Sequence, residues 1–203
     1  MKTDARDDFS RAHAFTAKWE GGLSDHPADT GGLTAYGASL KFVEGIASTR
    51  SGREFLRGIG VHPPVTRETM REEVTPERAR AMFKREFWDS LHLDDFAFPV
   101  ALTLYDAAVN CGCVQSVKLA QRGYNACVGP YGDRLDEDGK AGPLTRAALA
   151  THGTAAVVSA ALGARQRFYE DLVERKPSQA VFLDGWTNRV SALRAFLRRE
   201  GAI

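Results

Sequence analysis

The chain has 203 residues, of which 43% are hydrophobic, enough to bury the core of one domain or of a domain with a smaller lobe. Its 27 basic and 26 acidic residues leave a formal net charge of +1, so no global field would recruit nucleic acid or an anionic membrane. No run approaches the roughly 20 apolar residues that span a bilayer. We therefore expect no nucleic-acid partner and no membrane insertion, and three cysteines are too few for a disulfide framework.

Apolar residues recur at helical spacing along most of the chain, beginning with a stripe from Phe9 to Trp19 that ends before two glycines. Further helix starts are indicated by Thr75 followed by Pro76, by Pro99 and by Pro143, and Thr154 is a typical N-cap. The predicted helices cover residues 9–19, 75–91, 99–111, 114–128, 143–149, 154–175 and 182–197.

One segment, residues 31–40, has the glycines and alternation of a small β-hairpin, so we expect an α+β fold that is predominantly α-helical. Residues 48–74 are polar and broken by glycines and prolines, which predicts a loop-rich insertion. A soft boundary predicts two lobes, residues 1–92 and residues 93–203, packed as one unit.

The polar run from Trp19 to Gly37 contains the residues most suited to chemistry. Glu20 follows an aromatic residue at a helix end, where an apolar setting would raise its pKa and keep it protonated. Asp29 lies on a polar turn, where it would stay ionised. Two carboxyl groups in such different settings suit glycoside hydrolysis, in which one protonates the leaving oxygen and the other activates water or stabilises charge on the sugar. The simpler interpretation is a solvated glutamate and an ordinary turn.

This run, Glu-Gly-Gly, a turn with Asp and Pro, then Gly-Gly, Thr, an aromatic residue and Gly, resembles the N-acetylmuramidases of glycoside hydrolase family 108. They occur among phage and prophage endolysins and lysozyme-like secretion activators. The resemblance implies a lysozyme-like fold, a catalytic lobe in residues 1–92, and Glu20 as the catalytic acid. Eight residues separate Glu20 from Asp29, as in the broader phage-lysozyme pattern, but four rather than five separate Asp29 from Thr34. Thr34 either holds the nucleophilic water or forms a hydrogen bond with the backbone of its own hairpin.

Motifs in the second half resemble the predicted peptidoglycan domain that accompanies this family. They are the segments 87–89, 98–101, 106–110, 138–145 and 182–190. Asp106 and Asn110 lie one turn apart on one face of an apolar helix, where they either contact glycan or serve packing and capping.

The leading hypothesis is a muramidase that hydrolyses the β-1,4 bond between N-acetylmuramic acid and N-acetylglucosamine. Glu20 would act as general acid, Asp29 with Thr34 would position water or stabilise the transition state, and Tyr36 would stack on a sugar. The alternatives are a lytic transglycosylase and a non-catalytic wall-binding or secretion-accessory module. The histidines lack the spacing of a zinc site, and we expect neither metal nor cofactor.

The expected partner is the glycan strand of peptidoglycan, bound by a monomer. The charged start of the chain, residues 1–8, is followed by no apolar core of signal-peptide type. We therefore expect synthesis in the cytoplasm and action in the periplasm or cell wall after release through a holin-like pore or an export system. Such an enzyme would serve host lysis or local wall opening for secretion.

Overall fold

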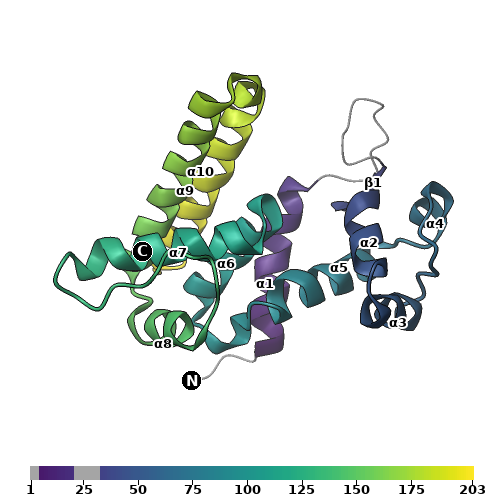
Figure 1. Ribbon diagram of the computed structural model, residues 1–203, viewed down its shortest axis with the longest axis horizontal. Helices are drawn as coiled ribbons and strands as arrows, with labels where there is room; N and C mark the ends of the chain where they lie inside the picture. Colours follow the sequence, from purple (N-terminus) through teal and green to yellow (C-terminus); the bar gives the residue numbers. More distant parts are fainter. Residues whose placement is uncertain (1–4, 21–32) are drawn as a thin grey trace. The chain divides into compact units, whose positions relative to one another are not determined.

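The computed structural model describes residues 5–20 and 33–203. It contains two compact units, one formed by His13–Glu86 and the other by Met1–Ala12 with Phe87–Ile203. Helices dominate both units and the only sheet among the described residues is a two-stranded hairpin, which confirms the predicted fold class (Figure 1). These units divide the chain differently from the predicted lobes, whose boundary after residue 92 stays a prediction.

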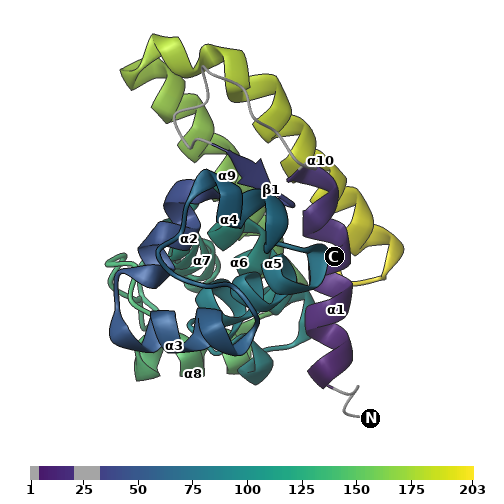
Figure 2. The same ribbon diagram turned by 90° about the vertical axis from the view of Figure 1, so that its right-hand side faces the viewer.

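The elements of the smaller unit begin inside the first helix and end inside a π-helical turn. In chain order they are α1 (Ala5–Thr16), η1 (Ala17–Trp19), β1 (Thr34–Ala35), β2 (Ala38–Ser39), α2 (Leu40–Ala47), α3 (Arg50–Gly58), α4 (Arg67–Glu72), α5 (Pro76–Phe83) and η2 (Lys84–Asp89). Figure 2 shows α2, α3 and α4 close together in this unit.

The hairpin is shorter than the predicted span of residues 31–40, although its position is confirmed. Thr34 pairs with Ser39 and the next pair closes the turn, at which Tyr36 and Gly37 have φ values of 51° and 82°. Positive φ at both central residues is the requirement of a type I′ turn, whose twist matches that of the strands. Ser39 then accepts a hydrogen bond from the backbone N–H of Phe42, so the second strand leads directly into α2.

The prediction of a loop-rich insertion over residues 48–74 is wrong, because this segment contains α3 and α4. Thr49 caps α3 by accepting from the Gly52 N–H at 3.0 Å. At α4, Thr66 and Thr69 form a reciprocal capping box. The glycines and prolines that suggested loops lie mostly at the ends of α3 and between the two helices, where they separate the helices without interrupting them.

The helix predicted over residues 75–91 changes character before its end. α5 ends at Phe83 and the chain continues as the π-helical turn η2. A π-helical turn has extra residues per turn and rotates the side chains that follow it. Trp88, at the end of η2, is fully buried and donates from Nε1 to Asp94 at 2.8 Å.

The larger unit is built from long helices, and the remaining predicted helices are confirmed with small shifts at their ends. They are η3 (Leu93–Asp95), α6 (Phe98–Cys111), α7 (Cys113–Val128), α8 (Pro143–His152), α9 (Ala155–Arg175), η4 (Pro177–Phe182) and α10 (Leu183–Arg199). α9 and α10 lie side by side (Figure 1). No helix in the described parts of the chain is long and apolar enough to cross a membrane.

The core of this unit forms around α6, which is buried continuously from Val100 to Ala108. Phe9, Trp88 and Tyr105 pack with edge-on rings 5.5 to 5.8 Å apart. α7 crosses α9 so closely at Gly123 that an added Cβ would lie 2.7 Å from the backbone nitrogen of Ala161.

Candidate active site

Glu20 lies at the end of the first helical segment, where η1 tightens the last turn of α1. Its backbone N–H donates to the Ala17 carbonyl at 3.2 Å, and its side chain is half-buried. Trp19, which the sequence suggested would desolvate it, is itself 37% exposed. Residues distant in the sequence therefore provide the close contacts of the Glu20 side chain.

The hairpin turn supplies one of these neighbours. A Cβ added at Gly37 would lie 2.6 Å from Cβ of Glu20 and 3.2 Å from Phe83 Cζ. Such a separation is far below van der Waals contact, so the backbone of Gly37 lies directly against the Glu20 side chain. The position also has a φ of 82°, which disfavours any residue with a side chain. Both the space and the backbone conformation require glycine here.

The contact brings Glu20 to the hairpin that carries two other predicted site residues. Thr34 is half-buried in β1, and Ala35, which points to the opposite face, is fully buried. Tyr36 is 43% exposed and has a positive φ, which is uncommon for an aromatic residue. Asp29 lies outside the described residues, so its separation from Glu20 stays untested.

The rings of His13, Phe42 and Phe83 pack together next to the contact between Glu20 and Gly37. The Phe83 ring lies 5.7 Å from the rings of both His13 and Phe42. Burial, aided by the charge of Arg80, lowers the pKa of His13 to about 4. His13 is therefore neutral at physiological pH. Sequence analysis did not identify His13 or Phe83 as neighbours of the site, although Phe83 lies in the helix predicted over residues 75–91.

Asp106, the first of the two α6 residues, is fully buried in the larger unit between two arginines. Arg165 donates from a terminal nitrogen to Asp106 at 2.6 Å, and Arg189 donates from Nε to both carboxylate oxygens at 3.0 and 3.1 Å. Burial alone would raise the pKa of Asp106, but the charges and hydrogen bonds of the arginines outweigh it and lower the pKa. These contacts join α6, α9 and α10.

Asn110 belongs to the same network. It accepts a hydrogen bond from the Tyr169 hydroxyl at 2.5 Å, and this hydroxyl accepts from Arg165 Nε at 2.7 Å. Trp186 stacks on Tyr169 with ring centroids 4.9 Å apart. The structure therefore places Asp106 and Asn110 together in a polar network inside the helical unit. These contacts are of the packing type, which is one of the two roles that the sequence left open for them.

The motif over residues 138–145 folds around a buried residue that sequence analysis missed. Gln121 donates to Asp138 at 3.0 Å and to Thr145 at 3.1 Å, and it accepts from the Gly139 N–H at 3.0 Å. Its amide thereby connects both ends of the motif, and no local pattern around Gln121 distinguishes it from an ordinary helix residue. Among residues 5–20 and 33–203, no group of three or more histidine, cysteine or acidic side chains could hold a metal ion.

Comparison with protein families gives this geometry a chemical context. The family described as glycosyl hydrolase 108 matches residues 13–112, which include Glu20 and the hairpin. The chain belongs to this family. In this family 108 hydrolase, a second family described as predicted peptidoglycan domain matches residues 115–191. The protein is therefore a glycoside hydrolase that acts on peptidoglycan.

A solved structure supports the lysozyme-like fold of the family 108 hydrolase. The structure of Brucella abortus SagA superposes with a TM-score of 0.71 at 23% sequence identity, covering 94% of this chain and 93% of that one. At this level of identity the likeness establishes the fold. No curated protein sequence matches the chain.

Proposed function

We propose that the protein is a muramidase that hydrolyses the β-1,4 bond between N-acetylmuramic acid and N-acetylglucosamine, with Glu20 as general acid. The observation that carries the proposal is the contact between the Glu20 side chain and Gly37 in the hairpin turn. It brings Glu20, the one described acidic residue of the motif, to the hairpin that carries Thr34 and Tyr36, within the segment that the family matches.

In the proposed reaction, Glu20 protonates the glycosidic oxygen as the bond to the anomeric carbon breaks. Asp29, with Thr34, positions water or stabilises the positive charge that develops on the sugar. The exposed ring of Tyr36 is available to stack on a sugar next to the bond. The free enzyme needs no cofactor for these steps.

The test replaces Glu20→Gln, which keeps the shape of the side chain and removes its transferable proton. We expect release of wall fragments to fall about 10²- to 10⁴-fold, the range for loss of a general acid. Glu54→Gln is the control, because Glu54 is exposed in the same unit and its one ion pair among the described residues is with Arg50, one turn away. Activity of the Glu20→Gln enzyme at the wild-type rate would exclude Glu20 as the acid.

Product analysis by mass spectrometry separates the alternatives. Reducing ends indicate hydrolysis, whereas 1,6-anhydro ends indicate a lytic transglycosylase. Sedimentation of the protein with insoluble peptidoglycan without release of fragments would indicate a non-catalytic module.

For the biological setting, we propose a monomeric enzyme that reaches the periplasm or cell wall through a holin-like pore or a dedicated export system. The product of the reaction, a cut glycan strand, would serve phage-type lysis or wall opening for secretion. Wall fractionation and gel filtration would test the location and the oligomeric state.

A further inference from the structure

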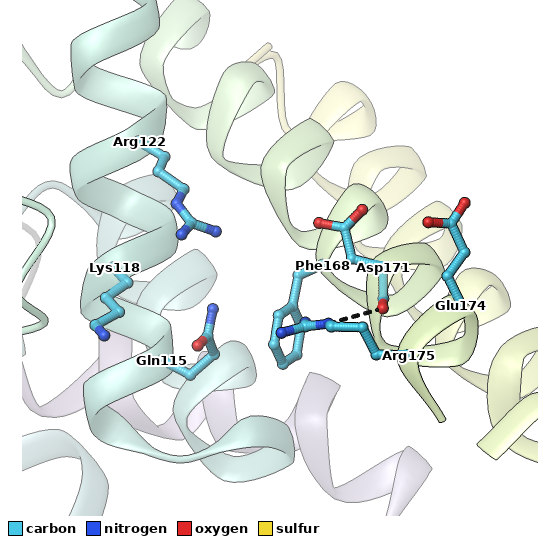
Figure 3. A pocket seen from close by; sticks show the side chains of 7 residues that line it. All are labelled: Gln115, Lys118, Arg122, Phe168, Asp171, Glu174 and Arg175. Atoms are coloured by element: carbon cyan, nitrogen blue, oxygen red, sulfur yellow. Dashed lines mark hydrogen bonds between the residues drawn. The ribbon is translucent and has the colours of Figure 1, made fainter. Parts of the chain in front are cut away.

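A pocket of about 490 Å³ lies between α7 and α9 in the larger unit, outside the segment that carries Glu20. Figure 3 shows side chains from both helices around it. Its size is typical of a site for a small ligand or a short peptide. It lies within the part of the chain that matches the predicted peptidoglycan domain.

The α7 wall of the pocket is cationic. It carries Lys118 and Arg122, one turn apart on the same face. Arg122 already donates from Nε to Glu137 at 2.9 Å. The Lys118 ammonium has no hydrogen bond or ion pair within the described parts of the chain, so it is available to an anion. Figure 3 shows the Arg122 side chain extending from α7 towards α9.

The α9 wall carries two exposed carboxylates, Asp171 and Glu174, together with Arg175. Arg175 donates from Nε to the backbone carbonyl of Asp171 at 3.0 Å, so the Asp171 carboxylate takes no part in this hydrogen bond. Neither acidic side chain pairs with a cation among the described residues. The α7 wall thus offers only cations to a ligand, whereas the α9 wall offers two carboxylates beside the Arg175 guanidinium.

The remaining lining of the pocket is one aromatic ring and one amide side chain. Phe168, its one aromatic residue, packs against the apolar cluster of Ala107, Leu119 and Ala164 and is half-buried. The side-chain nitrogen of Gln115 is buried without a hydrogen-bond acceptor in the described chain. Such a donor is costly to leave unsatisfied, and a turn of the Gln115 side chain into the pocket would let an oxygen of a bound ligand accept from it.

We propose that this pocket binds the zwitterionic peptide stem of peptidoglycan. A stem carboxylate lies at Lys118 and Arg122, and the free side-chain amine of a diamino acid residue lies at Asp171 and Glu174. The inference rests on the proposed function in one respect, because it takes peptidoglycan as the substrate of the enzyme. A second contact, on the peptide rather than the glycan, would hold a cut strand on the enzyme.

The test measures affinity by calorimetry, using the full chain and a synthetic stem peptide that carries carboxylates and one free side-chain amine. Lys118→Glu and Asp171→Lys each reverse one wall, and we expect each to weaken binding about tenfold. Acetylation of the peptide amine should weaken binding to the wild type similarly. Arg198→Glu, an exposed charge reversal on α10 away from the pocket, is the control and should leave affinity unchanged.

Three outcomes would overturn the proposal. The stem peptide fails to bind the wild type; Asp171→Lys tightens binding, which indicates a simple anion site; or Lys118→Glu weakens binding of stem-free glycan equally. The result is independent of catalysis, because Glu20→Gln should bind the stem peptide like the wild type. Conversely, the wild type and Arg198→Glu should cleave stem-free glycan at the same rate, so failure of the muramidase assignment would be seen separately.

Discussion

Gly37 connects the hairpin turn to the proposed catalytic acid. Its lack of a side chain allows its backbone to lie against Glu20 and Phe83, and its φ of 82° completes the turn that began at Tyr36. A general acid must be held within a fraction of an ångström of its productive position. We infer that Gly37 positions Glu20 through this contact.

Gly37→Ala should therefore impair both folding and activity. The new methyl group would overlap Cβ of Glu20, and a left-handed conformation costs an L-residue about 1–2 kcal/mol. We expect the free energy of unfolding to fall by at least that amount and activity to fall about 100-fold through displacement of Glu20. Chemical denaturation and a wall-lysis assay would measure the two effects.

Gly45→Ala is the matched control for this substitution. Gly45 lies in α2, where an added Cβ meets no atom within 4 Å. Alanine in a helix interior is more favourable than glycine by about 0.5–1 kcal/mol, so this variant should be slightly more stable and fully active. Full activity of Gly37→Ala would contradict the positioning role.

Asp106 determines how three helices of the larger unit are joined. One carboxylate accepts hydrogen bonds from Arg165 on α9 and Arg189 on α10, and all three residues are at most 4% exposed. A buried ion pair of this kind adds little to the free energy of unfolding compared with apolar residues of similar volume. Removal of one partner, however, leaves the others charged and unpaired.

Asp106→Asn should lower the free energy of unfolding by about 3–5 kcal/mol, because it leaves two buried guanidinium groups without a counter-charge. Urea denaturation followed by circular dichroism would measure this. Asp95→Asn is the control, since Asp95 pairs with Arg146 at 3.8 Å on the surface and its removal should cost less than about 1 kcal/mol. Equal effects of the two substitutions would show that the Asp106 network is not a buried ion pair in solution.

The pH dependence of unfolding is a property of the whole folded chain, and His13 contributes to it in one direction. Folding lowers its pKa from 6.5 to about 4, so between these values the unfolded chain binds the extra proton. Stability should therefore rise as the pH increases from 4 to 6.5 and should receive no further change from this residue above that range.

His13→Gln should remove this contribution, since glutamine does not titrate. We expect the difference in unfolding free energy between the two proteins to change between pH 4 and 6.5 and to be constant from pH 7 to 8. Comparison of the two proteins cancels the carboxylates, which also titrate near pH 4. A constant difference throughout the range would show that His13 is solvated in the folded protein.

At the scale of the whole molecule, the sequence by itself determined the helical fold class, the hairpin and the family. These depend on local signals: the caps at Thr75 and Thr154, apolar periodicity, and the motif around Glu20. Local signals also existed for the helices over residues 48–74, in the caps Thr49 and Thr66, but the glycines and prolines there concealed them.

Only the tertiary structure decided which distant residues meet. No local pattern indicates that Gly37 lies against Glu20, that Asp106 pairs with two arginines from other helices, or that Lys118 and Asp171 line one pocket. Such contacts depend on how helices pack, and packing follows from the shapes and burial of many side chains together. Sequence reasoning therefore identified the chemical groups, whereas packing decided their neighbours.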